Sequence, residues 1–224
     1  MQITRIFLLS IFTTIPCLGY LFYNPAESHQ TTFSIMIDPA GDSKHTGRIL
    51  DDNFERGITL QYAEKLKTAL EERYPTIRVV LTRFPGETLQ PLQNANFANR
   101  LGVNCYISIH FYHEHATKPK LYMYQFSYGD DFVQSRQDLM FYPYDKAYLI
   151  NNATTNQWAN LIKQSLEQEI YKKQFEVCGI YKVPFKPLIG IKAPALAFEI
   201  GLKSKNDWPQ YVDAVAESLR PIIA

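Results

Sequence analysis

The stretch Asn104-Cys-Tyr-Ile-Ser-Ile-His-Phe-Tyr-His-Glu-His115 decides the fold of this chain. Its segment from Cys105 to Ile109 is apolar, partly β-branched and too short for a helix, which is typical of a buried strand in a parallel sheet. His110 follows at the predicted end of that strand. Ligands of open α/β sheets collect at the carboxyl ends of the strands, so His110 is a candidate functional residue. A histidine with only structural hydrogen bonds fits the same pattern.

Strand and helix patterns alternate along the rest of the chain. Short apolar runs predict further strands at Phe33 to Ile37, Ile77 to Thr82, Leu121 to Tyr128 and Pro194 to Gly201. Apolar residues at helical spacing predict amphipathic helices over 55–73, 89–101, 154–173 and 208–223. This alternation predicts a single α/β domain with a mostly parallel central sheet and helices on both faces.

Composition fits one exported domain. The chain has 224 residues, 46% hydrophobic and 20% charged, which is enough for one sizeable core. A net charge of +1 gives no support for a nucleic-acid partner. Of three cysteines, Cys17 lies in the N-terminal apolar stretch, and buried free thiols are the simplest interpretation of Cys105 and Cys178.

The N-terminus is predicted to direct export. One positive charge at Arg5 precedes an uncharged stretch that Pro16 interrupts, so residues 1–23 are interpreted as a signal peptide or N-terminal anchor. Residues 24–32 form a linker and 33–224 the folded domain. We expect the protein in the periplasm or cell envelope, in contact with a membrane only through an uncleaved N-terminal segment.

An aromatic strand and the insertion after it are candidates for a substrate groove. Tyr122, Tyr124, Phe126 and Tyr128 alternate with smaller or polar residues, so one face of that strand is aromatic. Residues 129–152 are irregular and contain Gly, Pro and several aromatic residues. They form either a wall of the groove or a packed loop.

Two glutamates stand out from their surroundings. Glu55 lies in the first turn of the predicted long helix, where a carboxylate also stabilises the helix dipole. Glu199 interrupts an apolar strand, where it either forms a salt bridge, with Arg100 or Lys192, or transfers protons in a site. The second interpretation is favoured because an unpaired buried carboxylate is costly.

Short motifs follow one another along the chain: Ile37-Asp-Pro-Ala-Gly-Asp-Ser43, Glu55-Arg-Gly-Ile-Thr-Leu60, Ala98-Asn-Arg100, Ser108-Ile-His110 and Phe198-Glu-Ile-Gly201. In this order they resemble the zinc-dependent N-acetylmuramoyl-L-alanine amidases, peptidoglycan hydrolases of the cell-separation and sporulation type. The resemblance extends from about Ile35 to the C-terminus.

The resemblance implies a reaction and a set of site residues. The reaction is hydrolysis of the amide between N-acetylmuramic acid and L-alanine, with peptidoglycan or muramyl peptides as partners. Glu55 and His110 match zinc ligands of the family. Glu199 matches the catalytic glutamate that takes a proton from the zinc-bound water.

One motif departs from the family. The family's first zinc-binding histidine, in Ile-Asp-Pro-Gly-His-Gly-Gly, corresponds to Gly41. A catalytic zinc normally has three protein ligands and a water, so a substitute is needed. Asp42 and His45 are the candidates on the same loop, and the imidazole of His45 is the closer chemical replacement.

Two other functions compete with the amidase. A non-catalytic protein with the amidase fold could bind peptidoglycan or a cell-envelope partner, which Gly41 favours. The other competing function is that of a metal-dependent peptidase with different substrates. The presence of Glu55, His110 and Glu199 favours an enzyme.

Overall fold

The computed structural model describes residues 33–90, 92–129 and 143–223. The predicted signal segment and linker lie outside these residues, and so do residues 130–142 of the predicted insertion. In the part of the chain that is described, no helix combines the length and apolar character needed to cross a membrane.

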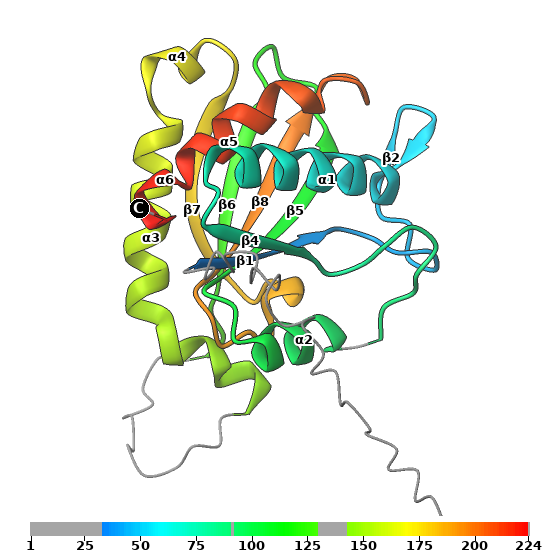
Figure 1. Ribbon diagram of the computed structural model, residues 1–224. Coiled ribbons are helices and arrows are strands. Elements are labelled where there is room, and N and C mark those ends of the chain that lie inside the picture. The colour runs from blue at the N-terminus through cyan, green and yellow to red at the C-terminus, as the bar shows by residue number, and fades with distance from the viewer. Residues whose placement is uncertain (1–32, 91, 130–142, 224) are drawn as a thin grey trace, which may run out of the picture. The chain divides into compact units, whose positions relative to one another are not determined.

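A six-stranded sheet with the order β4-β1-β5-β8-β6-β7 forms the centre of the domain (Figure 1). Its strands are β1 (Phe33–Pro39), β4 (Ile77–Leu81), β5 (Cys105–His113), β6 (Lys120–Phe126), β7 (Glu176–Val183) and β8 (Ala195–Leu202). All neighbouring pairs are parallel except β6 and β8, which are antiparallel. The connection from β5 to β6, over residues 114–119, is too short for a parallel crossover, so β6 runs the other way. The predicted mostly parallel sheet is confirmed.

Helices cover both faces of the sheet, as predicted. The α-helices are α1 (Glu55–Arg73), α2 (Gln93–Leu101), α3 (Asn152–Leu166), α4 (Glu169–Lys172), α5 (Val212–Ser218) and α6 (Arg220–Ile223). The 3-10 helices are η2 (Tyr144–Asn151), η3 (Lys186–Leu188) and η4 (Trp208–Tyr211). Figure 1 shows α1 and α5 on one side of the sheet and α2 on the other. A hairpin of β2 (Ile49–Leu50) and β3 (Asn53–Phe54) precedes α1.

Side chains of each strand alternate between two apolar cores because successive residues point to opposite faces. In β1, Ile35 and Ile37 join the core under α1, α3 and α5, whereas Met36 joins the core under α2. Cys105 is buried in the first of these cores, and both it and the partly buried Cys178 are free thiols.

The strand β5 is longer than its sequence pattern predicts. Its residues Tyr106–His113 pair in register with Ala195–Leu202 of β8. The prediction that His110 lies where the strand ends was therefore wrong, because this pairing continues the strand beyond the apolar run.

Two predicted helices are divided in the structure. The segment 154–173 contains α3 and the separate short helix α4, and 208–223 contains η4, α5 and α6. Pro209 lies in the first turn of η4, where its missing N–H costs nothing. Pro221 follows the break between α5 and α6 because proline has no N–H for a helical hydrogen bond.

Phe111 should be among the residues on which stability depends most. It is fully buried and its ring meets that of Tyr62 edge-on, with the centroids 5.2 Å apart. We expect Phe111→Ala to lower the free energy of unfolding by about 3–5 kcal/mol, measured by urea denaturation. Ile170→Ala is the control, since Ile170 is 65% exposed. Equal losses in the two variants would contradict this placement of the core.

Candidate active site

The sheet face under α2 changes from apolar to polar toward the carboxyl ends of the strands. On β1, β5 and β8 the apolar residues Met36, Tyr106, Ala195 and Ala197 are followed, two or more positions later, by Asp38, Ser108, His110 and Glu199. The period of two residues keeps each polar side chain on the face of the apolar residue before it. His110 and Glu199 are direct neighbours in the register of β5 and β8. The structure thus brings two predicted site residues together.

Glu55 reaches the same edge of the sheet from the start of α1. It is 3% exposed, and its Oε1 accepts a hydrogen bond from the backbone N–H of Phe111 at 2.9 Å. Its Oε2 accepts one from the backbone N–H of Arg48, also at 2.9 Å. Burial raises the pKa of Glu55, but the hydrogen bonds from His110 and from the Arg48 backbone outweigh it, so the pKa is lowered.

His110 connects Glu55 to a second buried carboxylate. Its Nδ1 lies 3.6 Å from Glu55 Oε1, and its Nε2 lies 3.0 Å from the hydroxyl of Ser108. That hydroxyl donates to Asp38 Oδ2 at 3.1 Å. Burial raises the pKa of Asp38 above its ordinary value, and it outweighs the hydrogen bonds from Thr82 and Ser108, which lower the pKa. The imidazole is therefore fixed by contacts at both ring nitrogens.

Glu199 is paired with an arginine that the sequence did not single out. Its Oε1 accepts a hydrogen bond from Arg48 Nη2, and its Oε2 accepts one from the Tyr124 hydroxyl at 2.6 Å. The salt bridge considered as the alternative interpretation of Glu199 does form, but with Arg48 rather than with Arg100 or Lys192. The actual partner lies on the loop before β2 and meets Glu199 only through folding.

The loop after β1 explains the glycine at position 41. Gly41 has a φ of +77°, and a Cβ there would lie 2.8 Å from the Cβ of Arg56. Arg56 in turn donates to the Ser43 carbonyl at 2.8 Å, and buried Arg83 donates to the Ala40 carbonyl at 3.1 Å. The loop is held against α1 so closely that no side chain, histidine included, fits at Gly41.

His45 points to Asp42 rather than to the predicted ligands. Its Nδ1 lies 3.2 Å from Asp42 Oδ2, and its side chain is 71% exposed. Asp42 also accepts hydrogen bonds from the backbone N–H groups of Lys44, His45 and Leu89. Burial raises the pKa of Asp42, but these hydrogen bonds lower it well below its usual range.

The arrangement offers two donors to a metal ion, where zinc normally has three protein ligands. The two are Glu55 and His110. Gly41 offers no side chain, and His45 is held by Asp42. Among the residues that the structure describes, no group of three His, Cys, Asp or Glu side chains is placed to hold a metal. These residues do not fit a three-ligand zinc site, and the role of His45 as substitute ligand stays a prediction.

An open cleft lies beside Glu199. It has a volume of about 430 Å³ and is lined by Arg48, Tyr112, Glu114, Lys120, Tyr122, Tyr124 and Glu199. The aromatic strand expected to form a groove wall, now β6, supplies Tyr122 and Tyr124. Phe185 stacks on Tyr124, with ring centroids 5.0 Å apart, and extends the aromatic surface toward His110.

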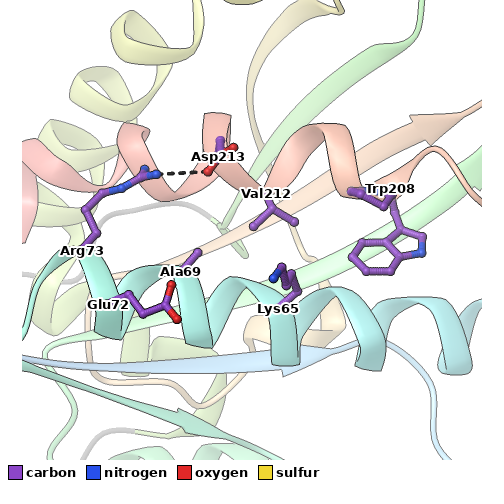
Figure 2. A pocket seen from close by; sticks show the side chains of 8 residues that line it. Lys65, Ala69, Glu72, Arg73, Trp208, Val212 and Asp213 are labelled. Atoms are coloured by element: carbon purple, nitrogen blue, oxygen red, sulfur yellow. Dashed lines mark hydrogen bonds and ion pairs between the residues drawn. The ribbon is translucent and has the colours of Figure 1, made fainter.

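A second cavity, of about 660 Å³, lies between α1 and the segment that starts at Trp208. Figure 2 shows Arg73 of α1 and Asp213 of α5 joined at one end of it, with Lys65 and Trp208 at the other. Its lining includes none of Glu55, His110 or Glu199. It is separate from the candidate active site.

Sequence reasoning missed Arg48 and Asp38 as members of the site, and it missed the contact of Tyr124 with Glu199. Arg48 lies with Lys44 on an irregular loop, and no spacing marks it. Tyr124 was placed on the aromatic face, but its hydrogen bond to Glu199 depends on β6 lying next to β8. Asp38 had a signal, since an aspartate ending a buried strand needs partners.

The comparisons agree with this fold. The family model described as N-acetylmuramoyl-L-alanine amidase matches residues 35–214. The chain therefore belongs to the N-acetylmuramoyl-L-alanine amidase family, and the expected enzyme class is confirmed at the level of the family.

One curated relative and two solved structures illustrate the likeness. The N-acetylmuramoyl-L-alanine amidase CwlM of Bacillus licheniformis is 34% identical over 76 residues, which are 34% of this chain and 30% of that protein. The match thus spans about a third of each. An amidase from Clostridium difficile 630 has a TM-score of 0.61 at 20% identity, over 84% of this chain and 93% of that one. Ami1 from Mycobacterium smegmatis has a TM-score of 0.62 at 14% identity, over 87% and 98%. At these identities the two structures support the fold.

Substitution of Gly41 tests the packing of its loop against α1. We expect Gly41→Ala to lower the free energy of unfolding by about 3 kcal/mol, from the positive φ together with the contact with Arg56. Gly86→Ala is the matched control, because Gly86 has a φ of +82° but no atom within 4 Å of an added Cβ. It should lose only about 1 kcal/mol, measured by the same denaturation. Similar losses would mean that position 41 has room for a side chain.

Asp42 should make stability depend on pH. Its pKa is lowered in the folded chain from an ordinary value of 3.8, so it stabilises the fold above that value and less as the pH falls below it. We expect the difference in unfolding free energy between the parent and Asp42→Asn to shrink between about pH 5 and pH 2, followed by thermal unfolding. A difference that stays constant across this range would contradict the lowered pKa.

Proposed function

We propose that this protein hydrolyses the amide between N-acetylmuramic acid and L-alanine in peptidoglycan. The observation that supports this most is the meeting of Glu55, His110 and Glu199, from three distant parts of the chain, at one edge of the sheet. Their order along the chain is that of the family's motifs. The adjoining cleft, with its tyrosines and two cations, offers contacts for a sugar and a carboxylate-bearing peptide.

The chain's own residues suggest how the proton is moved. Hydrolysis adds water to the carbonyl carbon, breaks the carbon–nitrogen bond and delivers a proton to the leaving amine. Glu199 would accept the water proton and pass it to the nitrogen, while Tyr124 orients its carboxylate. Arg48 donates hydrogen bonds to the Phe111 carbonyl and to Glu199. Its remaining N–H groups can donate to the carbonyl oxygen of the substrate.

A more specific form of this proposal is that the amidase activity depends on zinc. It would require Glu55, His110 and a third ligand, for which His45 is the candidate on the loop. His45 would first have to leave Asp42. If His45 is a ligand, His45→Ala should lower the zinc content as much as His110→Ala.

The N-terminal segment gives the proposed location. We infer that residues 1–23 direct export, so that the domain meets peptidoglycan in the periplasm or cell envelope. An uncleaved segment would hold the domain at the membrane.

The role of Glu199 can be tested directly. We expect Glu199→Gln to reduce release of the L-alanine-terminated peptide from purified muropeptides by at least about 100-fold, because the amide cannot accept the proton. Chromatography of the released peptide is the measurement, and thermal unfolding checks the fold. Glu176→Gln, at an exposed position on β7, is the control and should cleave like the parent. Cleavage by Glu199→Gln at the parental rate would rule out this role.

A non-catalytic function is the second candidate, favoured by the closed position at Gly41 and the pairing of Arg48 with Glu199. Such a protein would sediment with insoluble peptidoglycan yet release no peptide. Cleavage by the parent chain would exclude this candidate.

A further inference from the structure

The candidate active site contains two largely buried carboxylates, Glu55 and Glu199. Glu55 is 3% exposed, and the side chain of Glu199 is 13% exposed. Buried carboxylates need a cation or several hydrogen-bond donors, since the loss of hydration is costly. In a metal-dependent hydrolase the bound ion would supply that positive charge. The described residues place a different cation at this position.

Arg48 contacts both glutamates of the site and the backbone of β5. Its Nη2 donates to Glu199 Oε1, and its Nη1 donates to the Phe111 carbonyl at 3.1 Å. The same Nη1 lies 4.0 Å from Glu55 Oε1. The guanidinium therefore lies between the two carboxylates and is fixed by the backbone of β5.

The loop that carries Arg48 is built to bring it there. Gly47 has a φ of +74°, and a Cβ at this position would lie 2.7 Å from Glu55 Oε2. A glycine thus allows the backbone to come close enough for the Arg48 N–H to donate to that oxygen. Both the main chain and the half-exposed side chain of Arg48 are engaged at the site.

The same arrangement opposes a divalent ion. Both Glu55 oxygens accept backbone hydrogen bonds, and both Glu199 oxygens accept side-chain hydrogen bonds. A second cation near Glu55 would also be repelled by the guanidinium at short range. Gly41 has no side chain to supply the third protein donor of a zinc site, and its packing against Arg56 leaves no room for one at that position.

We propose that the Arg48 guanidinium is the resident cation of this site and replaces a metal ion as the counter-charge of Glu55 and Glu199. Arg48 is a positioning residue in this role, because it holds the two carboxylates in place. It has the role whether or not the chain cleaves the muramyl amide, so the two proposals fail independently.

This proposal can be tested on the purified full chain by measuring how the melting temperature responds to metal ions and to substitutions of Arg48. The melting temperature of the parent should change by less than about 1 °C on addition of EDTA or Zn²⁺, and elemental analysis should find well below one zinc per chain. Arg48→Ala should lower the melting temperature by at least about 4 °C because two buried carboxylates lose their counter-charge. Arg78→Ala, at an exposed position on β4, is the matched arginine control and should change it little.

The second half of the test separates charge from packing. In a Glu199→Gln background, Arg48→Ala should lower the melting temperature by less than half as much as it does in the parent, since one of the two carboxylate charges is absent. Arg48→Lys should recover at least half of the loss, and it serves if the alanine variant fails to fold. Stoichiometric zinc in the parent, destabilisation by EDTA, or an equal loss in both backgrounds would overturn the proposal. Stoichiometric zinc would leave the proposed amidase function standing.

Discussion

The Glu55 carboxylate is the interaction on which the site depends. It accepts hydrogen bonds from the backbone of β5 and from the loop before β2, and it lies against His110. One side chain at the start of α1 thereby fixes the sheet, the loop and the helix relative to one another. Its position in the first turn also lets the helix dipole favour its negative charge. This carboxylate therefore contributes to the placement of both His110 and Arg48.

The sheet supplies the second constraint, which is the register between β5 and β8. His110 and Glu199 lie opposite each other because the two strands pair from Tyr106 to His113 without interruption. A slip of one residue in either strand would turn the functional side chain of that strand to the other face. The apolar residues on either side of each functional residue are buried under α1 and α2, and this burial holds the register of β5 and β8. They therefore help to position the functional side chains.

Much of this arrangement could be predicted from the sequence, because the signals are local. Short apolar runs identified β1, β5 and β8, and helical periodicity identified α1, with Glu55 at its start as the structure confirms. The convergence of Glu55, His110 and Glu199 followed from motif order, which reflects a fold already known for the family. The length of β5 and the reversed direction of β6 could not be read, because both depend on which strands become neighbours.

The partners of the site residues were the least predictable part. Arg48 comes from an irregular loop, and its contact with Glu199 joins residues that lie far apart in the sequence. The sequence marked Gly41 as a lost ligand, but only the packing against Arg56 shows that the position is closed to any side chain. Together, Gly41, Gly47 and Arg48 change a site that resembles a metal centre into one organised around a guanidinium.

Anomalous X-ray diffraction at the zinc edge, from crystals of the purified chain grown with added zinc, would test this account most directly. The account predicts no anomalous peak near Glu55 and His110, with the Arg48 guanidinium in contact with Glu199. A peak at roughly 2.0–2.2 Å from both a Glu55 oxygen and a His110 nitrogen, with Arg48 turned away, would contradict it.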